Sequence, residues 1–450
     1  MSRPKNATKE RNATDDARAP SHSQAAARRG DNGVPNHGSH HAHSSQPAAR
    51  SGSATEQQSA AMKKGWQTKA LGAVCEVMNG GTPKTGVPEY WDGSHLWITP
   101  AEMGKRLSPY VGNTERKITG LGLRNSSAQM LPPHSVILSS RAPIGHLVIN
   151  TEPMATNQGC KGLIPGSQLQ HKFLYYYLSS IIDLLNLLGT GATFKELSGG
   201  KLKEVTIPVP PLPEQQRIVG ILDEAFAGIA TAKANAGKNL QNARALFESH
   251  LQSVFTQRGP GWVEKRLDAV AEFSQGIQVG LGDQSNTPGK GLVRFIRIID
   301  YTQGTDDVRY VKDPGRRYWA DKSDIVMVRY GTPGLVGRGI EGVIANNLFK
   351  ISILDASLTK DFLAYFLGQP TVQDNLSSQG SSTMPALTFK QLGAVAISFP
   401  QESGKQNSIV FKLDSLRDET QRLARLYERK LAALDALQKS LLHQAFTGEL

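Results

Sequence analysis

Residues 214–255 read EQQRIVGILDEAFAGIATAKANAGKNLQNARALFESHLQSVF, and this stretch contains no proline. Small or apolar residues recur along it at steps of three and four, which is the spacing of a coiled-coil seam. The spacing predicts one helix about 60 Å long at ~1.5 Å per residue. The seam residues are Ile218, Leu222, Ala225, Ile229, Ala232, Ala236, Leu240, Ala243, Phe247, Leu251 and Val254.

A second stretch, residues 406–446, carries a matching seam. The first seam is rich in alanine and the second in leucine, so the two helices can approach each other closely. An isolated helix of this kind would expose its apolar face to water. We therefore expect the two helices to pair, with any surplus apolar face available to another protein. The second seam consists of Ile409, Leu413, Leu416, Thr420, Leu423, Tyr427, Leu431, Leu434, Leu437 and Leu441.

The chain ahead of each helix repeats one unit. Trp66–Glu76 matches Trp262–Glu272 at an offset of 196 residues, and Gly80 then matches Gly276. Offsets of 189 to 191 continue to the ends of both helices, a regularity that chance does not produce. We interpret residues 62–258 and 259–450 as two copies of one unit. Further matches are Asn157, Gln158 and Lys161 with Asn346, Asn347 and Lys350, Phe173–Leu178 with Phe362–Leu367, and Phe255 with Phe446.

Each copy begins with a head of mixed α+β character. Short apolar runs bounded by Gly, Pro, Asn and Ser predict strands, and segments near 171–188 and 359–376 predict short helices. The expected strands lie at 135–138, 146–149, 324–328 and 348–353. The predicted divisions of the chain are a tail at 1–61, a first head at 62–212, a long helix at 213–258, a second head at 259–403 and a second long helix at 404–450.

Composition narrows the class of protein. The 450 residues carry a net charge of +12, of which +7 (20 Lys and Arg against 13 Asp and Glu) lies within 62–258, so nucleic acid is the obvious anionic partner. No apolar run approaches the ~18–20 residues of a membrane span, and the beginning of the chain has no apolar signal core. Two cysteines, Cys75 and Cys160, exclude a disulfide scaffold and fit the cytoplasm. Their apolar neighbours predict buried thiols.

Neither the tail nor the remaining motifs predict a catalytic or metal-binding site. Residues 1–61 lack large apolar side chains and are predicted to be disordered, and the histidines at 37, 40, 41 and 43 have no acidic or cysteine companions that would predict a metal site. Gly337–Gly342 has the spacing of a dinucleotide loop, but a strand-like run follows where that site needs a helix. Glu115–Lys117 offers half of a nuclease motif and is interpreted as solvated charge. No catalytic residue and no metal ligand is predicted.

Motifs of the first head carry a family resemblance. The chain resembles the specificity subunits of type I restriction–modification systems over residues 62–450. The most specific motif is Pro210–Gln216, which runs into the long helix, and Gln444–Leu450 is similar as well. The second copy lacks Thr-Pro after Gly276 and has no proline-rich run before its helix. The other motifs are Gly80–Pro83, Tyr90–Gly93, Leu96–Pro100, Arg141–Gly145 and Asn157–Gly159.

The resemblance implies two target recognition domains joined by an antiparallel pair of long helices. Each domain would read one half of a split site on double-stranded DNA. The helices would bind two methyltransferase subunits, and restriction subunits would complete the assembly. S-adenosylmethionine, ATP and Mg²⁺ would belong to those partners, so the chain itself would hold no cofactor and perform no catalysis.

DNA contacts are expected from basic side chains in loops of the heads. Each single one is more often a solvated surface charge, so only the set carries the prediction. The tyrosine runs 175–177 and 365–366 are instead expected in the core. The candidate DNA-binding residues are Lys84, Lys105, Arg106, Arg141, Lys161 and Lys195 in the first head and Arg294, Arg297, Arg316, Arg317, Arg329 and Lys350 in the second.

Two other classes of function fit the sequence. The chain could be a non-catalytic coiled-coil scaffold or adaptor without DNA readout of its own, or an enzyme with an unrecognised site. Selection of a DNA sequence by the complete complex separates DNA readout from the scaffold. Methylation or cleavage by the chain alone would indicate the enzyme.

Overall fold

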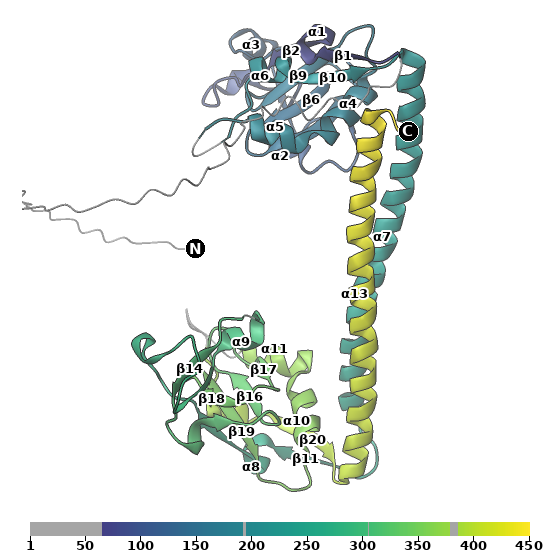
Figure 1. Cartoon of the computed structure of the whole chain (residues 1–450). Coiled ribbons are helices and arrows are strands. Elements are labelled where there is room, and N and C mark those ends of the chain that lie inside the picture. Colours follow the sequence, from purple (N-terminus) through teal and green to yellow (C-terminus); the bar gives the residue numbers. More distant parts are fainter. Residues whose placement is uncertain (1–64, 192–194, 305, 379–385) are drawn as a thin grey trace, which may run out of the picture. The chain divides into compact units, whose positions relative to one another are not determined.

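The computed structural model describes residues 65–191, 195–304, 306–378 and 386–450. They form two mixed α/β heads and two long helices, α7 (Leu212–Thr256) and α13 (Ser403–Thr447) (Figure 1). The predicted α+β class with paired long helices is confirmed. The predicted tail with its four histidines lies outside the described residues. No helix within the described ranges is long and apolar enough to cross a bilayer.

The first head contains two sheets and a strand pair. Its main sheet has the order β2-β9-β6-β7-β4, its second sheet has the order β5-β3-β8, and β1 pairs with β10 just before α7 begins. The strands are β1 (Gln67–Ala70), β2 (Cys75–Asn79), β3 (Trp91–Ile98), β4 (Tyr110–Val111), β5 (Arg116–Ile118), β6 (Val136–Ser140), β7 (Ile144–Asn150), β8 (Met154–Thr156), β9 (Cys160–Pro165) and β10 (Thr206–Val209). The helices are α1 (Leu71–Val74), η2 (Pro88–Tyr90), α2 (Pro100–Met103), α3 (Gly120–Arg124), α4 (His171–Ser180), α5 (Ile182–Leu188) and α6 (Gly199–Glu204).

The second head repeats this plan. Its main sheet has the order β12-β19-β16-β17, its second sheet has the order β14-β13-β18-β15, and β11 pairs with β20 just before α13. The strands are β11 (Trp262–Arg266), β12 (Ala271–Gln275), β13 (Leu292–Ile296), β14 (Arg309–Lys312), β15 (Trp319–Ala320), β16 (Ile325–Val328), β17 (Val336–Gly337), β18 (Gly342–Ile344), β19 (Leu348–Ile353) and β20 (Ala396–Pro400). The helices are α8 (Leu267–Val270), η3 (Leu281–Asp283), α9 (Ile298–Thr302), η4 (Arg316–Tyr318), α10 (Lys360–Leu367), α11 (Pro370–Ser378) and α12 (Phe389–Gly393).

A buried glutamine marks the start of each long helix, and in α7 it is Gln215, whose exposure is zero. Its side-chain oxygen accepts the backbone N–H of Gln170 at 2.9 Å. Its amide nitrogen donates to the carbonyl oxygens of Gln168 at 2.9 Å and Pro210 at 2.8 Å. Two of these hydrogen bonds thus fasten the first turn of α7 to the segment ahead of α4, and the third joins it to the residues between β10 and α7.

Gln406 makes the same three bonds at the start of α13. It accepts the backbone N–H of Thr359 at 2.8 Å and donates to the carbonyl oxygens of Ser357 at 2.5 Å and Pro400 at 2.7 Å. This side chain is also fully buried. The repetition of one polar arrangement at an offset of 191 residues confirms the predicted duplication.

Two further pairs of contacts follow the same repeat. The hydroxyl of Tyr176 donates to Asp223 at 2.5 Å in the first unit, and the hydroxyl of Tyr365 donates to Asp414 at 2.5 Å in the second. Each contact joins the first helix after the main sheet to the long helix of the same unit. The tyrosine runs therefore lie in or beside the core, as the sequence predicts.

The matched glycines Gly80 and Gly276 have one structural role. A Cβ atom at Gly80 would lie 1.8 Å from the carbonyl oxygen of Asn157, and one at Gly276 would lie 2.2 Å from that of Ala345. Backbone cannot yield to such contacts, so only glycine fits after strands β2 and β12. Both copies of the repeat thus need a glycine where two backbone segments approach each other closely.

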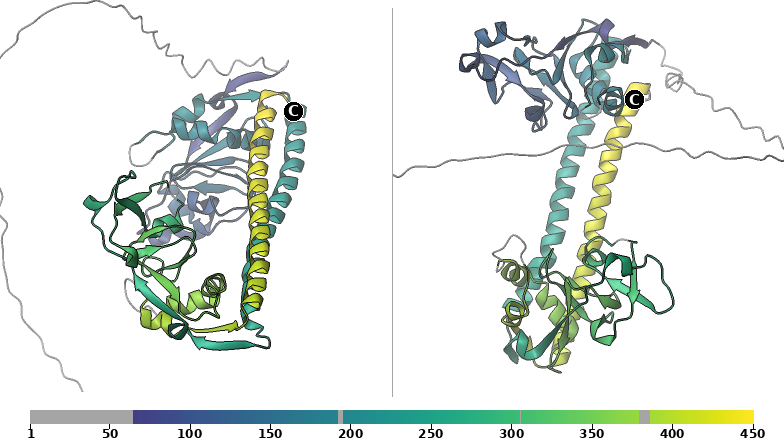
Figure 2. Two further views of the ribbon diagram at one scale, coloured as in Figure 1. Left: turned by 60° about the horizontal axis from the view of Figure 1, so that its bottom comes forward. Right: turned by 90° about the vertical axis from the view of Figure 1, so that its left-hand side faces the viewer.

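The two long helices run antiparallel and side by side (Figures 1 and 2). Lys233 near the middle of α7 pairs with Asp435 at 2.6 Å, and Arg244 further along pairs with Glu428 at 2.8 Å, so one helix descends as the other rises. Every predicted seam residue of α7 is buried or half-buried. In α13 the prediction is wrong at Leu437, which is 47% exposed. The seam takes a step of four there, because the 3.6-residue period drifts against a 3.5-residue repeat.

Each head is completed by the end of the helix that belongs to the other unit. Phe446 at the end of α13 packs 5.1 Å from Phe173 and 5.2 Å from Tyr177 of the first head, measured between ring centroids. Phe255 at the end of α7 packs 5.0 Å from Phe362 of the second head. The two heads therefore occupy opposite ends of the helix pair.

One predicted match, that of Asn157, Gln158 and Lys161 with Asn346, Asn347 and Lys350, is wrong by one residue. Lys161 on β9 faces Asn79 on β2, whereas Lys350 on β19 faces Ser274 on β12, one residue out of step with the repeat. The residue that corresponds to Lys161 is Phe349. A one-residue shift moves a side chain to the opposite face of a sheet, so the two lysines point in opposite directions.

Candidate nucleic-acid interface

The basic candidates of the first head fall into three groups, and the most buried is formed by Arg141, Lys161 and Glu196. Glu196 lies 3.7 Å from the guanidinium of Arg141 and 4.0 Å from the ammonium of Lys161. Burial lowers the pKa of Lys161, whose side chain is 7% exposed. Lys195 next to this group is exposed. Lys161 is thus an internal charge, and Arg141 and Lys195 form its accessible edge.

A second group lies around helix α2. The guanidinium of Arg106 pairs with the nearly buried carboxylate of Glu102 and donates to the carbonyl oxygen of Asn113 at 2.9 Å. Lys105 pairs with Glu115 at 3.0 Å, and both of these side chains are more than half exposed. Exposed ion pairs of this kind contribute little stability and exchange readily with another anion. Lys105 is therefore more available to a phosphate than Arg106.

The third group surrounds two tryptophans that pack against each other. Trp91 and Trp97 meet edge to face at 5.1 Å, and their indole N–H groups donate to the carbonyl oxygens of Lys84 at 3.2 Å and Gly81 at 2.9 Å. The Gly-Gly-Thr-Pro segment is thereby tied to strand β3. The ammonium-bearing side chain of Lys84 is exposed beside this pair. Arg116, which the sequence prediction treats as solvated charge, lies 3.7 Å above the ring centre of Trp91.

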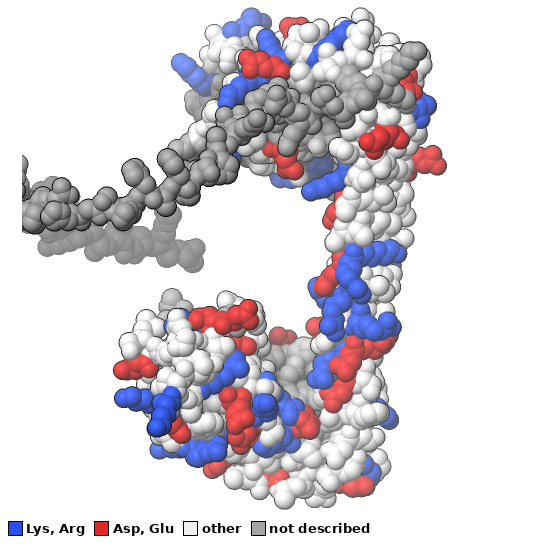
Figure 3. All heavy atoms as spheres, viewed as in Figure 1, with Lys and Arg blue, Asp and Glu red and all other residues white. Residues whose placement is uncertain are grey.

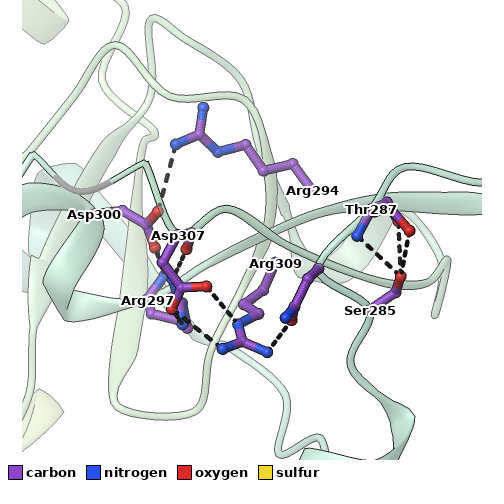
Figure 4. A network of polar contacts seen from close by, with 8 residues as sticks. Ser285, Thr287, Arg294, Arg297, Asp300, Asp307 and Arg309 are labelled. Atoms are coloured by element: carbon purple, nitrogen blue, oxygen red, sulfur yellow. Dashed lines mark hydrogen bonds and ion pairs between the residues drawn. The ribbon is translucent and has the colours of Figure 1, made fainter. Parts of the chain in front are cut away.

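In the second head, Arg294 and Arg297 belong to a polar network (Figure 4). Arg294 reaches Asp300 at 3.4 Å, and Arg297 lies between Asp300 at 3.4 Å and Asp307 at 3.3 Å. Asp300 also accepts the backbone N–H of Arg297 at 2.7 Å and caps helix α9. Both candidate arginines are thus held within the head by carboxylates rather than displayed as free charges.

Arg316 and Arg317 on η4 are the most accessible candidates of the second head. The side chain of Arg316 is 78% exposed, and its guanidinium lies 4.7 Å from the ring centre of Trp319. Arg317 lies 5.7 Å from the ring centre of Tyr318. Arginine stacked on an aromatic ring keeps its in-plane N–H groups for other acceptors, which suits contact with phosphates or base edges.

The two remaining candidates differ in their surroundings. Lys350 donates to the carbonyl oxygen of Trp319 at 2.8 Å and lies 4.0 Å from Asp324, so it joins β19 to β15 inside the head. Arg329 is half-buried at the end of β16. The predicted set of DNA-binding residues therefore contains both charges that stabilise the heads and charges that are accessible to a ligand. On the face drawn in Figure 3, basic and acidic side chains are intermixed over the second head and the helices.

The two cysteines lie in the interior of the first head. Cys75 and Cys160 are both buried, as predicted, and burial raises the pKa of each thiol to about 12. A thiol with this pKa is neutral at physiological pH and packs as a small apolar group. Across the described ranges, no three His, Cys, Asp or Glu side chains gather in a way that could hold a metal ion.

A groove of about 490 Å³ runs between the two long helices. Its floor is apolar and includes Ala243, Phe247 and Ala424, and its rims carry Arg244 and Glu428. Elsewhere on the two helices, Leu246 and Leu426 are 53% and 44% exposed. An apolar floor between charged rims is typical of a protein-docking surface.

The fold defines a duplicated, two-headed protein built on one antiparallel helix pair. Residues 63–238 match the family model described as type I restriction modification DNA specificity domain. The type I restriction enzyme MjaIX specificity subunit of Methanocaldococcus jannaschii is 26% identical over 86% of this chain and 94% of its own length. The corresponding EcoBI subunit of Escherichia coli is 23% identical over 71% and 74%.

Solved structures share the fold. The HsdS subunit of Thermoanaerobacter tengcongensis aligns with a TM-score of 0.56 at 20% identity, over 88% of this chain and all of that one. A chain from a study of complex assembly and conformational transition of the type I R-M system aligns with a TM-score of 0.71 at 21% identity, over 86% and 99%. Over residues 63–238 the chain thus carries a type I restriction modification DNA specificity domain, and over most of its length it is similar in sequence and fold to type I specificity subunits.

Proposed function

We propose that this chain reads an asymmetric, interrupted sequence on double-stranded DNA, one half with each head, and presents that site to methyltransferase and restriction subunits. The observation that carries the proposal is one fold present twice in reversed orientation on an antiparallel helix pair. Antiparallel modules suit the antiparallel strands of a duplex, so each head meets its half-site in an equivalent way.

Different side chains on equivalent positions account for an asymmetric target. Trp91 and Trp97 dominate the second sheet of the first head, whereas Arg294, Arg297 and Asp300 form a polar network at the corresponding sheet of the second. Two heads that differ in this way have different acceptors and donors to offer, so their half-sites are expected to be unlike.

The helix pair has the features of a platform for the catalytic subunits. The groove between α7 and α13 offers an apolar floor that includes Ala243, Phe247 and Ala424. Because the pair is pseudo-symmetric, we expect a second, related docking surface on it and therefore two methyltransferase subunits. S-adenosylmethionine, ATP and Mg²⁺ belong to the partner subunits in this proposal, and the chain acts in the cytoplasm without catalysis of its own.

Selection from random DNA tests the proposal. The chain is reconstituted with methyltransferase subunits of a type I system, and bound duplexes are sequenced. The proposal predicts one interrupted motif with two unlike halves. Binding without any selected sequence would leave only a scaffold, and methylation or cleavage by the purified chain with added cofactors would indicate an enzyme.

A further inference from the structure

Both heads carry an arginine at the same position of their second sheet. Arg116 is the first residue of β5 and faces Trp97 on β3, and Arg309 is the first residue of β14 and faces Phe295 on β13. Each aromatic partner is the penultimate residue of its strand. The equivalence therefore rests on the pairing of the strands and needs no similarity of sequence.

The two arginine side chains also leave the sheet on the same face. Two residues further along each strand, Ile118 and Val311 are buried, with exposures of 0% and 1%. Residues two apart on a strand share one face. Arg116 and Arg309 thus each lie at the rim of the small apolar core beneath their sheet.

Arg116 is held in place while its hydrogen-bonding groups remain available. Its guanidinium lies 3.7 Å from the ring centre of Trp91 and 5.5 Å from that of Trp97. Trp91 is itself fixed, because it is 8% exposed and donates to the carbonyl oxygen of Lys84. Over the described ranges, no carboxylate forms an ion pair with Arg116, although the residue is exposed. A guanidinium fixed by stacking loses little entropy when it binds a pair of acceptors.

Arg309 has the same position but a different set of partners (Figure 4). It forms an ion pair with Asp307 at 3.0 Å and also donates to the side-chain oxygen of Asn286. Asp307 also forms an ion pair with Arg297, and the side chain of Asp307 is 44% exposed. Hydrogen bonding from Arg309 lowers the pKa of Asp307, so the carboxylate remains charged near neutral pH.

We infer that Arg116 and Arg309 are equivalent DNA contacts, Arg116 binding a pair of acceptors directly and Arg309 binding one after it leaves Asp307. The acceptors are phosphate oxygens or the O6 and N7 atoms of guanine. An exposed ion pair shifts an equilibrium by less than about fivefold, whereas a bidentate arginine–guanine contact discriminates by about 5- to 150-fold, so the exchange at Asp307 is favourable. This inference rests on the proposed function.

The first test uses the complex with its methyltransferase subunits on the selected DNA site. Arg116→Ala is expected to weaken binding by about 10- to 100-fold, and Arg116→Lys, which keeps the charge, is expected to restore only part of it. Lys117→Ala is the matched control, because Lys117 leaves the same strand on the opposite face and the same charge is removed. The control should change binding by less than about threefold.

The pattern of loss identifies the acceptor. A guanine contact predicts that Arg116→Ala removes the preference at one base pair of a single half-site. A phosphate contact predicts uniform weakening on all sequences and a salt-dependence slope smaller by about 1. Arg116→Ala that binds like the wild type overturns the inference. A wild-type complex that selects no sequence would instead refute the proposed function and the inference with it.

The second head supplies an independent test. Arg309→Ala should weaken binding through the other half-site, with Lys312→Ala as the control on the opposite face of the same strand. Asp307→Asn removes the competing charge and should strengthen binding severalfold. Unchanged affinity in both Arg309→Ala and Asp307→Asn would contradict the equivalence. Thermal unfolding of each variant checks that the head still folds.

Discussion

Replacement of Gln215 by alanine tests the joint that fastens a head to its helix. The side chain is fully buried and makes three hydrogen bonds of 2.8 to 2.9 Å with the backbone of Gln168, Gln170 and Pro210. Each such bond contributes about 1 kcal/mol net. We therefore expect Gln215→Ala to lower the free energy of unfolding by about 3 kcal/mol.

Urea denaturation followed by circular dichroism measures this loss, with the urea dependence of the free energy checked for each variant. Gln216→Ala is the matched control, because Gln216 is the exposed neighbour on the same helix turn. Because Gln406 makes the same bonds in the second unit, Gln406→Ala should cost a similar amount. A loss below about 1 kcal/mol for Gln215→Ala, or an equal loss for the control, would show that the three buried hydrogen bonds of Gln215 do not stabilise the fold as expected.

Three further outcomes follow from packing and protonation. Phe446→Ala should destabilise the first head more than the second by about 2–3 kcal/mol, because Phe446 packs against Phe173 and Tyr177 of the first head; hydrogen exchange resolved by peptide would show it. Cys75 and Cys160, with thiol pKa values raised to about 12, should resist a thiol reagent at pH 8 until urea unfolds the chain, and rapid labelling of the folded protein would contradict their burial. Asp355, whose pKa is lowered to about 2 by its hydrogen bond from Lys265, contributes stability above its unfolded pKa near 4 and loses it as the pH falls toward 2. The difference in unfolding free energy between wild type and Asp355→Asn should therefore shrink between pH 5 and pH 2, and a constant difference would speak against it.

The long helices and the duplication were predictable because both patterns can be read directly along the sequence, without knowledge of how strands pair. Seam residues recur at helical spacing, and the repeat offsets drift by only a few residues from Trp66 to Phe446. The error at Leu437 arose where an ideal heptad and the actual helix fall out of phase. The error at Lys161 and Lys350 arose because strand register depends on pairing across the sheet, which one sequence does not reveal.

For the nucleic-acid interface, the sequence predicted the class of ligand but not which basic residues are available to bind it. Basic residues in the heads pointed to nucleic acid, but the sequence did not show that Arg297 is held by Asp300 and Asp307. It also passed over Arg116, because the stack on Trp91 joins residues 25 positions apart through the fold. The one available signal was the offset of 193 residues between Arg116 and Arg309, which lies within the drift of the repeat.

A chain with two identical heads would show whether each head reads its own half-site. Residues 259–403 would be replaced by a second copy of 62–212, joined at the matched glutamines Gln215 and Gln406, and the complex with its methyltransferase subunits would select from random DNA. The expected sequence is an interrupted palindrome, in which the half-site of the first head appears twice as an inverted repeat. A selected sequence that keeps two unlike halves, or a direct repeat, would contradict it.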